Sequence, residues 1–436
     1  MTKRTTLTSG ALLALALMAP ATMSAQTQDE EVREKKSRLQ IGGYGEAVYS
    51  RNFYSDNVYR YSSPDNYKDD KHGRFDIPHA VVYIGYDFGK GWSVSSEIEF
   101  EHGGTGGAYE KEYEEGGEWE QEVERGGEVE LEQFWLQKSF CPEFNIKAGH
   151  IVVPIGYTNA HHEPLNFFTV YRPEGEATIF PCTWHQTGIS FWGRAKDWRY
   201  EAQVLAGLNA SGFTIDNWIQ GGAASPFEFD PGNKVAVAAR VDNYSIKGLR
   251  IGLSGYYGQC VNNSYNVESG KYYEVGGNLL IGALDFSYDD HNWIVRGNFD
   301  YGHLGDAYTI SQANQNQSNT SPFTRSHVGD RAIACGIEAG YDVFSQIRKL
   351  REDGQKLYVF GRYEYYDSYH PAESSDGYVN TDYPYTEKSR MAVGINYMPI
   401  KEIVVKAEYS KRFLKSSYND EPSISVGIAY AGFFTK

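Results

Sequence analysis

The feature that most constrains this chain is a series of short runs in which apolar and polar residues alternate. From Trp92 to Glu101, Trp, Val, Ile and Phe fill four of the five positions on one face, and Ser and Glu fill the other face. The runs 198–208, 234–243, 292–302 and 389–398 alternate in the same way. A period of two residues is that of a β-strand with one apolar and one polar face.

The apolar faces of these runs are predicted to contact lipid. After the first 25 residues no stretch of eighteen apolar residues occurs, which excludes transmembrane helices, and only a closed barrel can then span a bilayer. Aromatic residues make up 15% of the chain, and many runs begin or end in Trp, Tyr or Phe on the apolar face. That placement is typical of the aromatic girdles of a membrane barrel.

Sixteen such runs follow one another, and an even number of strands is expected for a single-chain barrel. They span residues 38–50, 74–88, 92–101, 128–140, 144–153, 188–195, 198–208, 234–243, 249–259, 278–289, 292–302, 332–344, 356–367, 389–398, 402–411 and 423–434. We therefore predict an all-β fold, a transmembrane antiparallel β-barrel of 16 strands.

The N-terminus predicts export. Lys3 and Arg4 precede a short apolar stretch, 10–21, and small residues lead to Ala25, as in a secretory signal peptide. We expect a signal peptide at 1–25, a periplasmic lead at 26–37 and the barrel at 38–436.

Short and long connections alternate between the runs. Short ones include 89–91, 141–143 and 196–197, whereas long ones include 51–73, 102–127, 154–187, 209–233, 303–331 and 368–388. This pattern predicts short periplasmic turns and long extracellular loops.

The third long connection, residues 154–187, is unusual in composition. It holds four prolines yet is rich in Phe, Tyr, Ile and Trp, which favours a segment packed inside the barrel. We expect its apolar residues (Ile155, Phe167, Phe168, Ile179 and Phe180) to pack on the wall. The hydrophilic residues expected to narrow the lumen are His162, Glu163, Arg172, Glu174 and Glu176, together with Asn159.

Several segments resemble a known family. GGYGEAVYS (42–50), GEVELEQFWLQ (127–137), KAGHIVVPIGYTNAHHEPLNFFTVYRP (147–173) and FPCTWHQTGISFWG (180–193) resemble the phosphate-selective porin O and P family of outer-membrane channels. The resemblance implies a homotrimeric porin in the outer membrane of a Gram-negative bacterium, in contact with its lipid and lipopolysaccharide. It implies passive diffusion of small hydrophilic solutes or ions, with anions such as phosphate among the candidates, and a constriction formed by the third loop.

Charges on the predicted lumen face divide by position in the chain. The early strands carry Glu46, Glu97, Glu99, Glu101, Glu128, Glu130 and Glu132. The later strands carry Arg240, Arg250, Arg296, Arg362, Arg390, Lys406 and Arg412, interrupted by Asp242, Asp300, Glu364 and Glu408. Two interpretations are open: opposed rows of charge create a field across the pore, or the charges pair between neighbouring strands.

Three further groups have alternative interpretations. The donors His161, His162, Glu163, Cys182 and His185 suit a metal, but their spacing fits no ligand template, and hydrogen bonding to the wall is the alternative. The Glu-rich stretch 97–132 suits calcium or lipopolysaccharide bridging, or a solvated loop. Cys182 and Cys260 either pair in an outside loop or stay reduced. We predict no metal site and no cofactor.

Other function classes are an adhesive or scaffold barrel and, less favoured, a barrel hydrolase. A hydrolase needs a nucleophile and a base at one depth, and no Gly-x-Ser-x-Gly elbow occurs, so we expect no enzyme. The net charge of −16 argues against nucleic acid as a partner.

Overall fold

The structure is a computed structural model that describes residues 38–435 except 56, 62, 68–70, 103–106, 114–118, 126–127, 182, 224–229, 262–274, 320, 322, 384 and 415–420. The predicted signal peptide and periplasmic lead lie outside the described residues.

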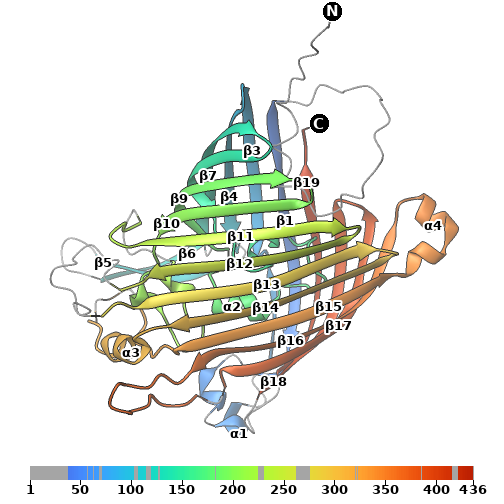
Figure 1. Ribbon diagram of the computed structural model, residues 1–436. Helices are drawn as coiled ribbons and strands as arrows, with labels where there is room; N and C mark the ends of the chain where they lie inside the picture. Colours follow the sequence, from blue (N-terminus) through green and yellow to red (C-terminus); the bar gives the residue numbers. More distant parts are fainter. Residues whose placement is uncertain are drawn as a thin grey trace, which may run out of the picture.

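Sixteen antiparallel strands form one closed barrel, as predicted. In chain order they are β1 (Leu39–Asn52), β3 (His79–Gly89), β4 (Trp92–Glu101), β7 (Glu128–Cys141), β8 (Phe144–Val152), β9 (His185–Ala195), β10 (Trp198–Ala206), β11 (Val235–Ile246), β12 (Leu249–Gln259), β13 (Asn278–Asp290), β14 (Trp293–Leu304), β15 (Arg331–Asp342), β16 (Lys356–His370), β17 (Glu387–Ile400), β18 (Ile403–Leu414) and β19 (Glu421–Phe433). Each strand pairs with its neighbours in sequence, and β1 pairs with β19 to close the ring (Figure 1).

Two segments of the structure differ in detail from the prediction. The run 74–88 is two strands, because Ile77 and Pro78 separate β2 (His72–Asp76) from β3, and a proline cannot donate to the ladder. β1 pairs with both. The connection 102–127 contains a separate hairpin of β5 (Gly107–Tyr113) and β6 (Trp119–Arg125).

The barrel is apolar outside and polar inside. On β11 the side chains of Val235 and Val237 are 62% and 49% exposed, whereas Ala236 and Ala238 on the opposite face are fully buried and Arg240 is 3% exposed. A water-soluble sandwich would bury the valines instead. An exposed apolar face over a buried charged one is the pattern of a barrel in lipid.

The two ends of the barrel differ. One end carries two-residue turns, such as Lys196–Asp197, and one longer turn formed by η5 (Val343–Gln346) and α4 (Arg348–Glu352). The exposed Trp92, Trp198 and Trp293 each begin a strand at this end. Figure 1 shows α4 at this end and β5, β6 and α3 (Ala307–Gln315) at the other.

Short helices occur in the long loops. They are η1 (Val58–Tyr61), α1 (Pro64–Tyr67), η2 (Asn159–His161), α2 (Glu174–Ile179), η3 (Ala210–Gly212), η4 (Gln220–Gly222) and α3. In the described part of the chain, no helix is long and apolar enough to cross a membrane.

Candidate functional site

The loop between β8 and β9 is anchored to the wall at its base by buried apolar side chains. Ile155, Ile179, Phe180 and Trp184 are at most 1% exposed and belong to one cluster with the inward side chains of β10 to β13. Trp218, from the next long loop, packs against Phe180 in the same cluster.

Hydrogen bonds among the loop's own residues hold its base together. The Asn159 side chain donates to the carbonyls of Val153 and Trp184 at 2.6 and 3.0 Å. The buried carboxylate of Glu176 accepts from the amides of Tyr157 and Asn159 at 2.9 and 3.1 Å. Gly156 has a φ of +74°, and a Cβ there would collide with the Glu176 carboxylate, so glycine is required.

The middle of the loop reaches the opposite wall. The amides of Phe168, Val170 and Gly175 donate to Glu338, Glu408 and Glu364 at 3.4, 2.8 and 3.1 Å. Lys406 donates to the carbonyls of Phe167 and Thr169. The loop therefore spans from β8 and β9 to β15 through β18, and Figure 1 shows α2 within the ring of strands.

Two cavities adjoin different parts of this loop. The cavity toward the long loops has a volume of about 610 Å³ and adjoins residues 172–178. Its charged lining is Arg60, Arg74, Arg172, Lys388 and Arg412 against Glu174, Asp216 and Glu421. The cavity toward the short turns has a volume of about 140 Å³ and adjoins residues 160–163. Its charged lining is Lys147, Arg194, Arg199, Arg240 and Arg250 against Glu97, Glu163, Glu201 and Asp242, with His161 and His162.

Most charges on the later strands pair with one another. We call this set the paired arc: Arg240, Arg250, Arg296, Arg362 and Arg390 with Asp242, Asp285, Glu338, Glu364 and Glu408. Its members are at most 9% exposed. Arg240 lies 2.8 Å from Asp242 and 2.9 Å from Asp285, and Arg362 lies 3.2 Å from Glu338 and 3.0 Å from Glu364. Arg250, Arg296, Arg362 and Arg390 each pair with a carboxylate on a neighbouring strand, which confirms that prediction for them. Arg240 pairs within β11 and with Asp285 of β13 instead.

The early strands present a different arrangement. We call Glu46, Glu97, Glu99 and Glu132 the acidic wall, and they are 1% to 6% exposed. Among the described residues, Arg172 is the only Lys or Arg within 4 Å of these carboxylates, 3.9 Å from Glu99. His162 of the loop lies 3.6 Å from Glu97.

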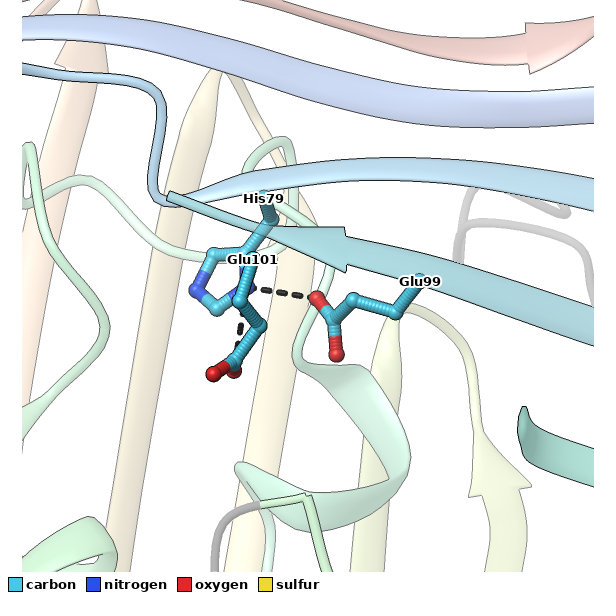
Figure 2. Close-up of side chains that lie close together, drawn as sticks. All are labelled: His79, Glu99 and Glu101. Atoms are coloured by element: carbon cyan, nitrogen blue, oxygen red, sulfur yellow. Dashed lines mark hydrogen bonds and ion pairs between the residues drawn. The ribbon is translucent and has the colours of Figure 1, made fainter. Parts of the chain in front are cut away.

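A second histidine adjoins the acidic wall. Figure 2 shows the ring of His79 against the carboxylates of Glu99 and Glu101. His79 Nδ1 lies 2.5 Å from Glu99 Oε1 and 3.9 Å from Glu101 Oε1. The hydrogen bond to Glu99 already satisfies this nitrogen.

The loop's own charges are strongly perturbed. Burial alone would lower the pKa of His162, but Glu97 and Glu132 outweigh it and raise the pKa to about 9. Burial would raise the pKa of Glu174, yet Arg390 and Arg412 hold it well below its usual range. Burial raises the pKa of Glu176 to about 7, since the amides that it accepts from only partly offset the loss of water.

The predicted site residues whose side chains the structure describes fall into three groups. Those that line the two cavities are His162, Glu163, Arg172, Glu174, Glu97, Arg240, Arg250 and Arg412. Those on the inner face that do not line these cavities are Glu46, Glu99, Glu101, Glu130, Glu132, Arg296, Arg362, Arg390 and Lys406. Glu176 is buried within the loop base, and the side chain of Glu128 lies outside the described residues.

The sequence prediction overlooked several lumen charges. Asp285, Glu338 and Glu421 are buried acceptors of the arginines, and Lys147 lies 3.8 Å from Glu201. Glu338 lies an even number of positions after the buried Ala332 and Ala334, so it shares their face of β15. The alternation could therefore have identified it. The predicted packing of Ile155, Phe167, Phe168, Ile179 and Phe180 is confirmed by their burial.

The histidines and cysteines are arranged as follows. His161 Nδ1 lies 2.9 Å from the carbonyl of Tyr157, and His185 lies 2.5 Å from His150. The thiol of Cys260 is buried and donates to the carbonyl of Gly277. Cys182 lies outside the described residues, so its pairing stays a prediction.

Comparison with known proteins supports the fold. No family model matches the chain. An uncharacterized protein of Aquifex aeolicus is 27% identical over 396 residues, covering 88% of this chain and 78% of that protein. The structure of an anion-selective porin from Comamonas acidovorans is 10% identical, covers 90% of this chain and 99% of its own, and has a TM-score of 0.50. OmpF of Salmonella typhi, in complex with daunomycin, is 12% identical, with coverage of 90% and 97% and a TM-score of 0.48.

These observations settle the fold and the place of the molecule in the cell. The closed barrel of 16 strands has an apolar outer face, which only a lipid environment accommodates. The chain therefore has the fold of outer-membrane porins and lies in the outer membrane of a Gram-negative bacterium.

Proposed function

We propose that this protein is a passive diffusion channel for small hydrophilic solutes, with the third loop as its constriction. The observation that carries the proposal is the pair of charged cavities on the two parts of a loop that spans the lumen. A barrel with a purely adhesive role would have no need of charged cavities within its lumen. The family resemblance adds a homotrimeric assembly to the proposal.

We further propose a weak preference for anions, with phosphate among the solutes. The cavity toward the long loops has five cationic and three anionic side chains in its lining, and the other cavity has five and four. A positive excess raises the local concentration of anions.

The proposal is tested by conductance in planar bilayers. Deleting residues 158–180 removes the segment that spans the lumen and widens the cross-section through which ions pass. Single-channel conductance is therefore expected to rise at least about twofold. Purified protein that forms no channels would contradict the proposed function. Channels whose conductance is unaltered by the deletion would contradict the role of the loop.

Selectivity is tested by reversal potentials in a salt gradient. Lys388→Gln removes one positive charge from the larger cavity and is expected to shift the preference toward cations. Lys401→Gln is the matched control, because Lys401 is 89% exposed in a short turn, paired with Glu402. Equal reversal potentials for the two variants would contradict the assignment of the cavity to the permeation path.

A further inference from the structure

We propose that Glu97, Glu132 and His162 form a binding site for a divalent transition-metal ion that ties the third loop to the barrel wall. Glu97 belongs to β4, Glu132 to β7 and His162 to the loop. One ligand atom from each lies within 4.8 Å of the others, and all three residues are buried.

The ligand atoms are not used by other contacts. Among the described residues, neither carboxylate oxygen of Glu132 has a hydrogen-bond partner, and the side chain of Glu132 is 1% exposed. Glu97 Oε1 and His162 Nε2 also have none in that part of the chain. Buried polar atoms without partners are costly, so three that converge on one point indicate a ligand.

The distances fit an ion better than a direct contact. His162 Nε2 lies 3.6 Å from Glu97 Oε1, too long for a hydrogen bond. Two ligands at 2.0–2.2 Å from one tetrahedral ion lie about 3.4 Å apart.

The remaining contacts hold each ligand in place. His162 Nδ1 lies 2.8 Å from the carbonyl of Asn159, which leaves Nε2 to point at the wall. Gln133 donates to the other oxygen of Glu97, and this leaves Oε1 for the ion. Glu97 and His162 both line the cavity toward the short turns, which provides access for an ion.

Charge points to a cation. Within 4 Å of the acidic wall, the described structure has one Lys or Arg, Arg172, and it adjoins Glu99 and neither Glu97 nor Glu132. A divalent ion would supply the missing positive charge. One imidazole and two carboxylates favour zinc and its neighbours over calcium or magnesium, which prefer oxygen alone.

The neighbouring group of His79, Glu99 and Glu101 is the alternative position. Its histidine nitrogen is already bonded to Glu99, so it has less capacity for a ligand (Figure 2). His150 and His185 are hydrogen-bonded to each other and serve as a second comparison position.

Calorimetric titration with ZnCl2 tests the site on the full folded chain in detergent, after treatment with a chelator. We expect about one ion per chain, released again by chelator. Glu132→Gln, Glu97→Gln and His162→Ala are each expected to lower zinc affinity at least about tenfold. Zinc is expected to raise the unfolding temperature of the unaltered protein and not that of Glu132→Gln.

The controls are His79→Ala and His185→Ala, which are expected to keep the affinity. Folding of each variant is checked by the heat-dependent shift in gel mobility. Because the three ligands lie on three different elements, the test can still be made if one of the ligand variants fails to fold. The proposal is overturned if the unaltered protein binds no zinc, or if affinity falls only in His79→Ala or His185→Ala. Binding is read without conductance, so this outcome is independent of the proposed channel function.

Discussion

The paired arc and the acidic wall lie on the same inner surface of one barrel, yet they treat buried charge in opposite ways. In the paired arc, five arginines meet five carboxylates, and three of the carboxylates also accept amides of the third loop. In the acidic wall, the described structure places one Lys or Arg, Arg172, within 4 Å of the four carboxylates, and two histidines lie beside them. Facing the lumen therefore does not decide whether a charge supports the fold or is available to a ligand.

The largest difference is expected when one partner of a buried pair is removed. Arg362→Ala leaves Glu338 and Glu364 with less compensation beneath the loop, at an expected cost of about 3–5 kcal/mol of unfolding free energy. Urea unfolding in detergent, followed by tryptophan fluorescence, measures the loss.

Arg348→Ala is the control for that experiment. Its partner Glu352 lies 2.7 Å away, and the two side chains are 84% and 59% exposed. Such a surface pair is worth at most about 0.5 kcal/mol. Equal losses in the two variants would show that the paired arc does not stabilise the barrel.

Glu176 is a buried carboxylate whose partners are backbone amides and not cations, so it allows a different test of buried charge. Its pKa is raised from 4.5 to about 7, so the folded state holds the proton more tightly than the unfolded chain. Stability is therefore expected to fall as pH rises from about 4.5 through about 7, by up to about 3 kcal/mol. Unfolding at pH 5 and pH 8 measures this, and Glu176→Gln is expected to flatten the profile. An equally steep profile in the variant would assign the dependence to other groups.

The smallest effect is expected in the acidic wall. In metal-free buffer, Glu132→Gln removes a buried negative charge that has no hydrogen-bond partner in the described structure, so stability should be unchanged or rise by about 1 kcal/mol. Glu338→Gln, the same chemical change in the paired arc, is expected to lose about 2–4 kcal/mol, because it leaves Arg296 and Arg362 undercompensated. A comparable loss in both variants would remove the distinction between the two regions.

The sequence alone determined the barrel, because the side-chain period of a strand is a local property. The alternation from Trp92 to Glu101 predicts the burial of Glu97 and Glu99 as directly as the strand itself. The apolar residues of the third loop were equally predictable, since Ile179 and Phe180 cannot stay in water. The run 74–88 was predicted less accurately, because the break between β2 and β3 at Pro78 was overlooked.

Only the tertiary structure decided which charges meet. Pairing depends on strand register and on where the loop crosses the lumen, and neither is encoded within one run of residues. Arg390 contacts Glu174, 216 positions earlier, as well as Glu364 and Glu408 on its neighbouring strands. The histidine motif at 161–163 fitted no metal template, because the other two ligands of the proposed site come from β4 and β7. A site whose ligands lie on separate elements has no local spacing, so only the fold brings it together.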